Sequence, residues 1–134
     1  MQYLTKSILI FLGLLLGLLV QSHEMNPARL SLEEGENGSY SGTWMFPVNA
    51  VGLPAEVSFT DCQEEQRNFP EVKGKYLVSS IQIKCDGTLM GKEIAFKGLT
   101  RLTDALVSIK FQDQTTFEGL ASINSPKFDI PEEV

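Results

Sequence analysis

His23 is the only histidine in this chain of 134 residues, and it follows an apolar N-terminal run. Cleavage of the chain after Ser22 would give His23 a free α-amine beside its imidazole, with the Glu24 carboxylate next to both. Amine and imidazole nitrogens suit copper, nickel or zinc, so His23 and Glu24 form a candidate metal site. Such a site needs three or four ligands, and the sequence offers no second imidazole. We favour the alternative, an exposed first residue, and expect no cofactor unless nickel or copper binds here.

Cys62 and Cys85 are the only two cysteines of the chain. An even number of cysteines in an exported protein predicts a disulfide. Two buried thiols, or half of a metal site, are the alternatives. The metal alternative has little support, because the sequence shows neither CxxC spacing nor a nearby histidine. A bridge across this loop would stabilise the fold by roughly 3 kcal/mol.

The sequence carries no arrangement typical of catalysis. His23 is the one candidate base for a Ser/His/Asp set, and no GxSxG elbow accompanies the serines. Adjacent carboxylates occur as three pairs, namely Glu33 with Glu34, Glu64 with Glu65, and Glu132 with Glu133. Neighbours in a strand point to opposite faces, so we interpret each pair as solvated surface or loop. We therefore expect that the protein is not an enzyme and has no small-molecule substrate.

Residues 8–20, ILIFLGLLLGLLV, form an uncharged apolar run that follows Lys6. The run is shorter than the roughly 20 residues that a membrane-spanning helix needs. Val20 and Ser22 add the small residues of a cleavage site, so we predict a signal peptide over residues 1–22. An uncleaved anchor is the alternative. Export then predicts a periplasmic or extracellular location.

Residues 23–134 are enough for one compact domain, and we predict a single one. Lys6 is the only charged residue of the signal, so this domain holds 10 basic and 17 acidic residues. The acidic balance argues against nucleic acid, and against an anionic membrane surface, as the main partner.

Apolar and polar residues alternate with a period of two through this domain. Ala28, Leu30 and Leu32 share one face, the turn GENG follows, and SYSGTWMF alternates again, which predicts a hairpin. Further strands are predicted in AEVSFTDC, YLVSSIQIKC, KEIAFKGL, ALVSIKF, TTFEGLASI and KFDI, whereas residues 63–75 are predicted to be a loop. Seven or eight short strands predict an all-β fold. We favour an immunoglobulin-like antiparallel β-sandwich over a closed barrel, with Trp44 in the core.

Two stretches are more distinctive than generic strands, HEMNPARLSL from His23 and GLTRLTDALVSIKFQD from Gly98. Together with LMGKEIAFKGL and the aromatic strand ending at Phe46 and Pro47, they resemble the extracytoplasmic N-terminal region of HupE/UreJ-type hydrogenase/urease accessory proteins. The positions that carry the resemblance include Pro27, Gly98, Thr103 and Asp104.

The resemblance implies a link to metal handling. In that family a bundle of histidine-rich transmembrane helices follows the soluble domain, and the proteins handle nickel or a related metal for metalloenzyme maturation. No second hydrophobic segment follows here, so we expect a truncated relative, a fragment or a stand-alone soluble paralogue. The expected function is that of an exported, non-catalytic accessory domain for a membrane-protein partner or a missing transmembrane domain. A secreted protein–protein interaction module with no metal role is the alternative.

Overall fold

The computed structural model describes residues 26–48 and 54–133, and this part of the chain forms ten β-strands. The predicted signal peptide, His23 and Glu24 lie outside the described residues. The strands are β1 (Ala28–Glu34), β2 (Ser39–Pro47), β3 (Glu56–Phe59), β4 (Cys62–Arg67), β5 (Glu71–Lys73), β6 (Tyr76–Cys85), β7 (Glu93–Lys97), β8 (Ala105–Lys110), β9 (Thr116–Ala121) and β10 (Lys127–Asp129).

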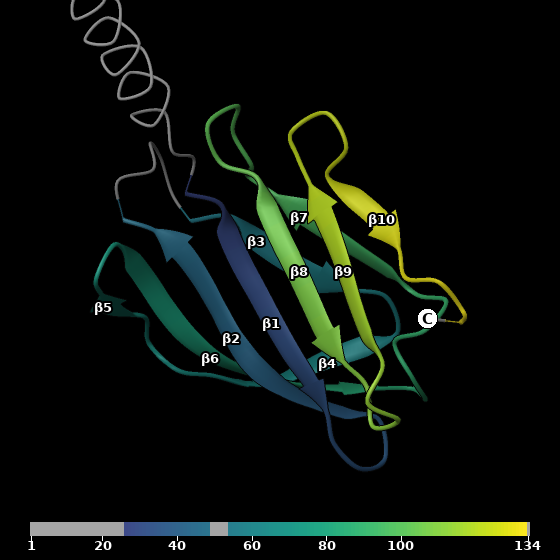
Figure 1. The fold of residues 1–134 in the computed structure, drawn as a ribbon. Coiled ribbons are helices and arrows are strands. Elements are labelled where there is room, and N and C mark those ends of the chain that lie inside the picture. Colours follow the sequence, from purple (N-terminus) through teal and green to yellow (C-terminus); the bar gives the residue numbers. More distant parts are fainter. Residues whose placement is uncertain (1–25, 49–53, 134) are drawn as a thin grey trace, which may run out of the picture.

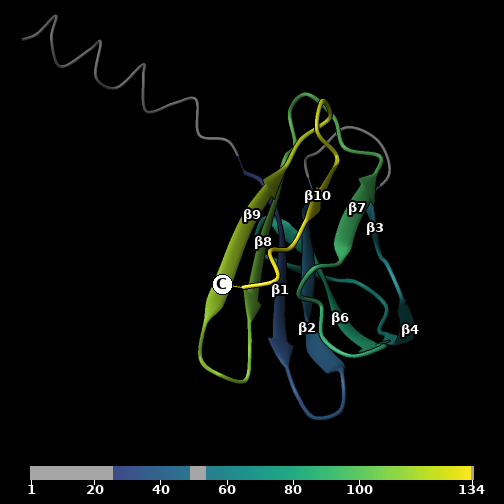
Figure 2. The same ribbon diagram turned by 90° about the vertical axis from the view of Figure 1, so that its right-hand side faces the viewer.

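The strands form two sheets that pack face to face. The large sheet has seven strands in the order β4-β6-β2-β1-β8-β9, with β5 paired to β6, and the small sheet has the order β10-β7-β3 (Figure 1). Figure 2 shows the small sheet covering one face of the large one. The predicted all-β sandwich is thus confirmed, with ten described strands instead of the seven or eight expected.

The predicted first hairpin is formed by β1 and β2. Leu30 lies opposite Trp44 in the ladder, and the residues of β1 alternate between buried and exposed as their polarity requires. Asn37 and Gly38 both have positive φ, +57° and +78°, which is the conformation of a tight hairpin turn. The Asn-Gly dipeptide therefore sets the register of the hairpin.

β1 is an interior strand of the large sheet and has two different kinds of neighbour. It pairs antiparallel with β2 and parallel with β8, where Ala28 lies opposite Ala105. The β1–β8 ladder is the only parallel pairing in the described part of the chain. The first strand of the fold is therefore held between the strand that follows it, β2, and a strand from much later in the chain, β8.

The prediction of a loop over residues 63–75 is wrong. This segment forms most of β4 and all of β5, both paired with β6 at the margin of the large sheet. After Cys62, every residue of β4 is exposed, and so is every residue of β5. Because neither face of these strands is buried, their sequence shows no alternation, and backbone pairing with β6 holds them instead.

The core lies between the two sheets and is lined by the residues that the alternation places inward. Trp44 of β2 is buried, as predicted, and its ring centroid lies 5.6 Å from that of Phe96 on β7. The indole Nε1 donates a hydrogen bond of 3.2 Å to the Ala55 carbonyl. At the other margin Phe117 of β9 packs against Phe128 of β10, with ring centroids 5.8 Å apart.

Candidate functional site

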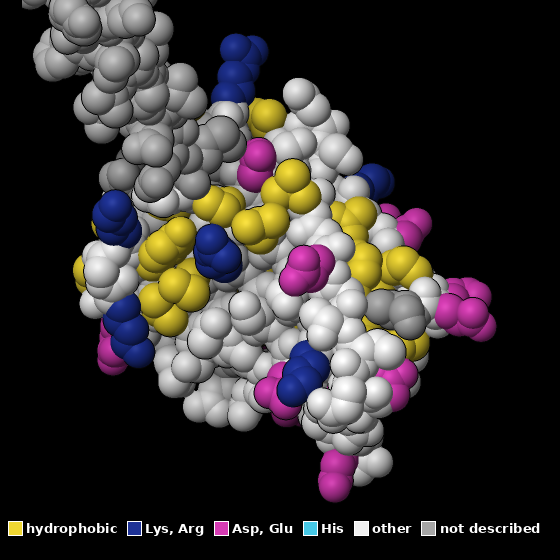
Figure 3. Space-filling model, in the orientation of Figure 1, with side chains coloured by type: hydrophobic (Ala, Val, Ile, Leu, Met, Phe, Trp, Pro, Cys, Tyr) yellow, Lys and Arg dark blue, Asp and Glu magenta, His cyan; other side chains and the backbone are white. Residues whose placement is uncertain are grey.

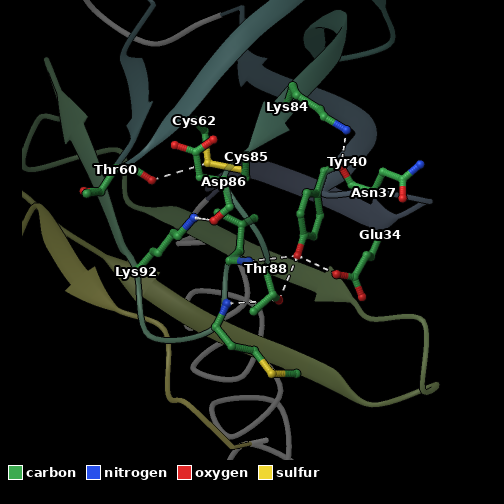
Figure 4. Close-up of a disulfide and its surroundings, with 12 residues drawn as sticks. Glu34, Asn37, Tyr40, Thr60, Cys62, Lys84, Cys85, Asp86, Thr88 and Lys92 are labelled. Atoms are coloured by element: carbon green, nitrogen blue, oxygen red, sulfur yellow. Dashed lines mark hydrogen bonds between the residues drawn. A yellow bond between two sulfur atoms is a disulfide. The ribbon is translucent and has the colours of Figure 1, made fainter.

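Cys62 and Cys85 form the predicted disulfide. They lie directly opposite each other in the β4–β6 ladder, with Cα atoms 3.9 Å apart. The bridge attaches the exposed strand β4 to β6, which runs through the interior of the large sheet (Figure 4). Both sulfur atoms are bonded to each other, so neither is a thiol nor a ligand for a metal.

Beside the disulfide, the hydroxyl of Tyr40 joins three segments of the chain. It donates a hydrogen bond of 2.9 Å to Glu34 Oε2, accepts one of 2.9 Å from the Leu89 backbone N–H, and lies 3.1 Å from Thr88 Oγ1 (Figure 4). The Glu34 carboxylate also accepts a hydrogen bond of 3.0 Å from the backbone N–H of Gln112. The hydroxyl and carboxylate thereby fix the β1–β2 turn against the β6–β7 and β8–β9 loops.

The interpretation of Glu34 as solvated surface is therefore wrong. Glu33 and Glu34 do differ in exposure, as adjacent strand residues should, and Glu33 is exposed. Glu34 is half-buried because β1 ends there and its side chain reaches the buried hydroxyl of Tyr40. Glu64 is exposed on β4 and forms a salt bridge of 2.7 Å with Arg67.

Burial raises the pKa of the Tyr40 phenol above its ordinary value near 10, and the neighbouring Glu34 carboxylate acts in the same direction. Hydrogen bonds from Thr88 and from the Leu89 backbone oppose this shift. The side chain is only 1% exposed, so a substrate has no access to its oxygen. We therefore assign this group a structural role.

A shallow cleft of about 230 Å³ lies where β2 faces the segment before β3, and Trp44 and Phe46 are among the residues that line it. The indole N–H in its wall already binds the Ala55 carbonyl, and Arg67 already pairs with Glu64. The cleft thus shows no free buried polar group that would orient a ligand.

No group of three or more His, Cys, Asp or Glu side chains in the described part of the chain is placed to hold a metal ion. The candidate metal site at His23 and Glu24 lies outside the described residues, so the structure does not describe its geometry.

Four of the positions that carry the resemblance, Pro27, Gly98, Thr103 and Asp104, lie at one end of the sandwich. Pro27 directly precedes β1, and the Ala28 N–H donates a hydrogen bond of 2.8 Å to the Asp104 carbonyl. Thr103 is buried and bridges back to Thr100 in the turn before β8. We call this the entry end, because the described chain enters the fold here; it also includes the loops at residues 98–104 and 122–126 (Figure 1).

Gly98, the fourth of these positions, begins the β7–β8 loop in a conformation that favours glycine. Its φ is +94°, and a β-carbon there would lie 3.6 Å from the Cα of Ala55. Gly98 thus lets the chain leave β7 next to the segment that precedes β3. These four positions therefore shape the backbone of the entry end, and they do not form a catalytic or metal cluster.

Of the seven large hydrophobic side chains that are exposed in the described part of the chain, five lie at the entry end or on the adjoining outer face of the large sheet, the face turned away from the small sheet. The other two, Phe69 and Val72, lie at the β4–β5 margin. Leu102 is 74% exposed in the loop before β8, and Val48 and Ile123 are also exposed in loops of this end. On the outer face, Leu106 is 36% and Leu120 is 56% exposed. Figure 3 shows hydrophobic side chains gathered over the upper part of this face, and mostly polar ones below.

The ladder registers place five outward residues in one line across the strands. We call this line the outer row; its members, in order from β6 to β9, are Val78, Met45, Arg29, Leu106 and Leu120. Neighbouring strands lie about 4.8 Å apart, so the outer row spans roughly 19 Å. It is the candidate binding surface of the domain.

Sequence reasoning did not identify the outer row. Alternation indicates which residues point outward, and Leu106 and Leu120 were visible as apolar residues in outward positions. It does not show that residues from five different strands lie side by side.

A scan against models of known protein families finds no match for this chain, and a search of curated proteins finds no relative.

Proposed function

We propose that this protein is an exported, non-catalytic accessory domain that docks onto a membrane-protein partner in a metal-handling system. The metal would be nickel or a related ion, and it would be the cargo of the partner. The resemblance to HupE/UreJ-type accessory proteins motivates the metal and the membrane partner.

The observation that carries the docking role is the position of the exposed apolar residues. Five of the seven lie at and beside the entry end, where the described chain begins. Apolar side chains that gather on the surface of a small domain mark interaction sites. A partner at the membrane would meet this end first while the signal segment is still attached.

An exported location is supported by the bridge between Cys62 and Cys85, because disulfides persist in oxidising compartments. Within the described residues, no helix has the length and hydrophobicity to cross a bilayer. We propose the periplasm or the extracellular space, and we propose that the domain binds neither nucleic acid nor a small-molecule substrate.

Docking can be tested in intact cells with a photo-crosslinking amino acid placed at Leu120. The same amino acid at Gln63, which is exposed on β4 at the opposite margin of the large sheet, is the matched control. We expect a crosslinked product with a multi-span membrane protein from position 120 and none from position 63. Equal products from both positions, or no product with any membrane protein, would contradict the proposal.

The metal role is tested separately by deleting the gene in its own host. The activity of nickel-dependent enzymes should fall at limiting nickel, and added nickel salt should restore it. If the activity is unchanged while the Leu120 crosslink persists, the alternative applies, a secreted interaction module with no metal role.

A further inference from the structure

The outer row contains a single charged residue, Arg29, at its centre. Met45 of β2 lies on one side and Leu106 of β8 on the other, and Val78 and Leu120 lie at the ends. Arg29 is exposed, whereas Met45 and Val78 are half-buried. The row is therefore an apolar strip around one guanidinium group.

Arg29 has no carboxylate partner within salt-bridge distance among the described residues, where the only salt bridge joins Arg67 and Glu64. The neighbouring outward line is uncharged on the four central strands, where it consists of Ser80, Thr43, Ser31 and Ser108, and it ends on β9 with the exposed Glu118. Burying this guanidinium against an apolar partner surface would be unfavourable, because a buried charge without a counter-charge loses its hydration.

We propose that the outer row binds a segment of a partner protein in which an aspartate or glutamate is flanked on both sides by apolar residues. The carboxylate accepts hydrogen bonds from Arg29, whose planar guanidinium matches carboxylate geometry. The apolar flanks cover Met45 and Val78 on one side and Leu106 and Leu120 on the other. This inference rests on the proposed docking function and specifies its surface and the chemistry of the partner.

A second copy of this chain is the other occupant that the test has to separate from a partner segment. A two-fold axis through the centre of the row would place Arg29 against Arg29, with two like charges desolvated together. Shifted pairings could bring Arg29 to Glu71, which lies beside Val78 at the end of the row, or to Glu118, which ends the neighbouring outward line on β9. A dimer of either kind is an outcome that the sedimentation experiment below detects.

The test is a selection of peptides from a displayed random library, performed on the exported protein and on two charge-reversal variants. In Arg29→Glu the charge at the centre of the row is inverted. Lys110→Glu is the matched control, since it makes the same charge change on the outer side of β8, away from the row. Thermal unfolding of each variant confirms that the fold is intact.

The wild type and Lys110→Glu should both select peptides with an acidic residue between apolar ones, and Arg29→Glu should select a basic residue there instead. In titrations of one selected acidic peptide, Arg29→Glu should weaken binding by about 10-fold or more. Arg29→Lys should retain part of the affinity, and Leu106→Ser with Leu120→Ser should lose most of it.

The proposal is overturned if no peptide is enriched, or if the selected charge does not depend on residue 29. It is also overturned if sedimentation shows a dimer, or flotation shows binding to phosphatidylglycerol vesicles, that Arg29→Glu abolishes. In those cases a second copy or a lipid surface occupies the row. A failed selection combined with a persistent Leu120 crosslink in cells would reject the acidic partner segment and leave the proposed docking function standing.

Discussion

The Tyr40 hydroxyl lies 2.9 Å from Glu34 Oε2, so that a buried phenol and a half-buried carboxylate tie the two strands of the first hairpin together next to their turn. Both groups also bind loops that come much later in the chain, through the N–H groups of Leu89 and Gln112. The contact thereby joins the first hairpin to the β6–β7 and β8–β9 loops, at the end of the sandwich opposite the entry end.

Tyr40→Phe should lower the free energy of unfolding by about 2 kcal/mol, because it leaves the Leu89 N–H without its acceptor while the ring stays packed. Urea denaturation of the oxidised protein measures this difference. The matched control is Tyr76→Phe, since Tyr76 is half-buried at the start of β6, and this change should have little effect. Equal losses in the two variants would show that the hydroxyl network is not the cause.

The raised pKa of Tyr40 predicts how the difference in stability between the wild type and Tyr40→Phe depends on pH. The unfolded chain releases the phenolic proton near pH 10, whereas the folded chain holds it to higher pH. The stability advantage of the wild type over Tyr40→Phe should therefore be constant below pH 10 and should decrease as the pH rises beyond it. An advantage that grows above pH 10 would contradict the direction of the shift.

Two turn glycines provide a matched pair for separating backbone strain from steric clash. Both Gly38 and Gly87 have positive φ, but a β-carbon at Gly38 would lie 2.5 Å from the Cys85 carbonyl oxygen, and one at Gly87 meets nothing within 4 Å. Gly87→Ala should destabilise the fold by about 1 kcal/mol through strain alone. Gly38→Ala should cost clearly more in the same denaturation experiment. Equal costs would show that the turn can move away from β6.

Removal of the disulfide by Cys62→Ala with Cys85→Ala should lower the free energy of unfolding by roughly 3 kcal/mol through the entropy of the released loop. Reduction of the wild type should give a similar loss. Mass spectrometry after alkylation without reductant should find both cysteines unlabelled in the oxidised protein. Gln63→Ala, next to Cys62 on β4, controls for the loss of side-chain contacts and should be nearly neutral.

Asp113 should titrate at lower pH than an ordinary aspartate. Its carboxylate accepts hydrogen bonds from the hydroxyl and the backbone N–H of Thr115, at 2.5 Å and 2.9 Å, and these lower its pKa. Carboxyl-carbon NMR across an acid titration measures the pKa directly. Thr115→Val removes the hydroxyl and should raise the pKa of Asp113 toward its usual value, whereas Thr116→Val should not change it.

The exported protein should begin at His23, and its intact mass will show whether residues 1–22 have been removed. If His23 then acts as a ligand, its free α-amine should matter, so a version with one additional residue before it should bind Cu(II) or Ni(II) more weakly. Binding should also weaken as the pH falls through about 6.5, where imidazole becomes protonated. Equal affinities in calorimetry would leave His23 as an ordinary first residue.

The sequence predicted those strands that bury one face. The alternation of Ala28, Leu30 and Leu32 against polar neighbours is a direct consequence of packing on one side only, and the structure confirms it. The sequence does not predict β4, because side chains on both faces of this strand, such as those of Gln63 and Glu64, are exposed and packing imposes no pattern on them.

The candidate binding surface could not be predicted in the same way. Leu106 and Leu120 belong to neighbouring strands, but Val78 and Met45 reach the same line only because β1 lies between β2 and β8. That order follows from a parallel pairing between the first and the eighth strand, which local sequence patterns do not encode. Tyr40 likewise lies in a predicted strand, SYSGTWMF, but the alternation of that strand does not show the long-range hydrogen bond of its hydroxyl to the Leu89 N–H.

The place of β1 between β2 and β8 also bears on how the protein would fold if it is exported as proposed. In an exported chain β1 would leave the translocation channel before β8, and both of its edges are paired only when β8 has followed. Pairing between segments so distant in the chain makes folding slow, since the loop must close before the contact is formed. The large sheet therefore cannot be completed before the C-terminal quarter of the chain, which holds β8 and β9, is available. For an exported chain this order would leave the sheet open until translocation ends, so the segments still to pass would remain extended.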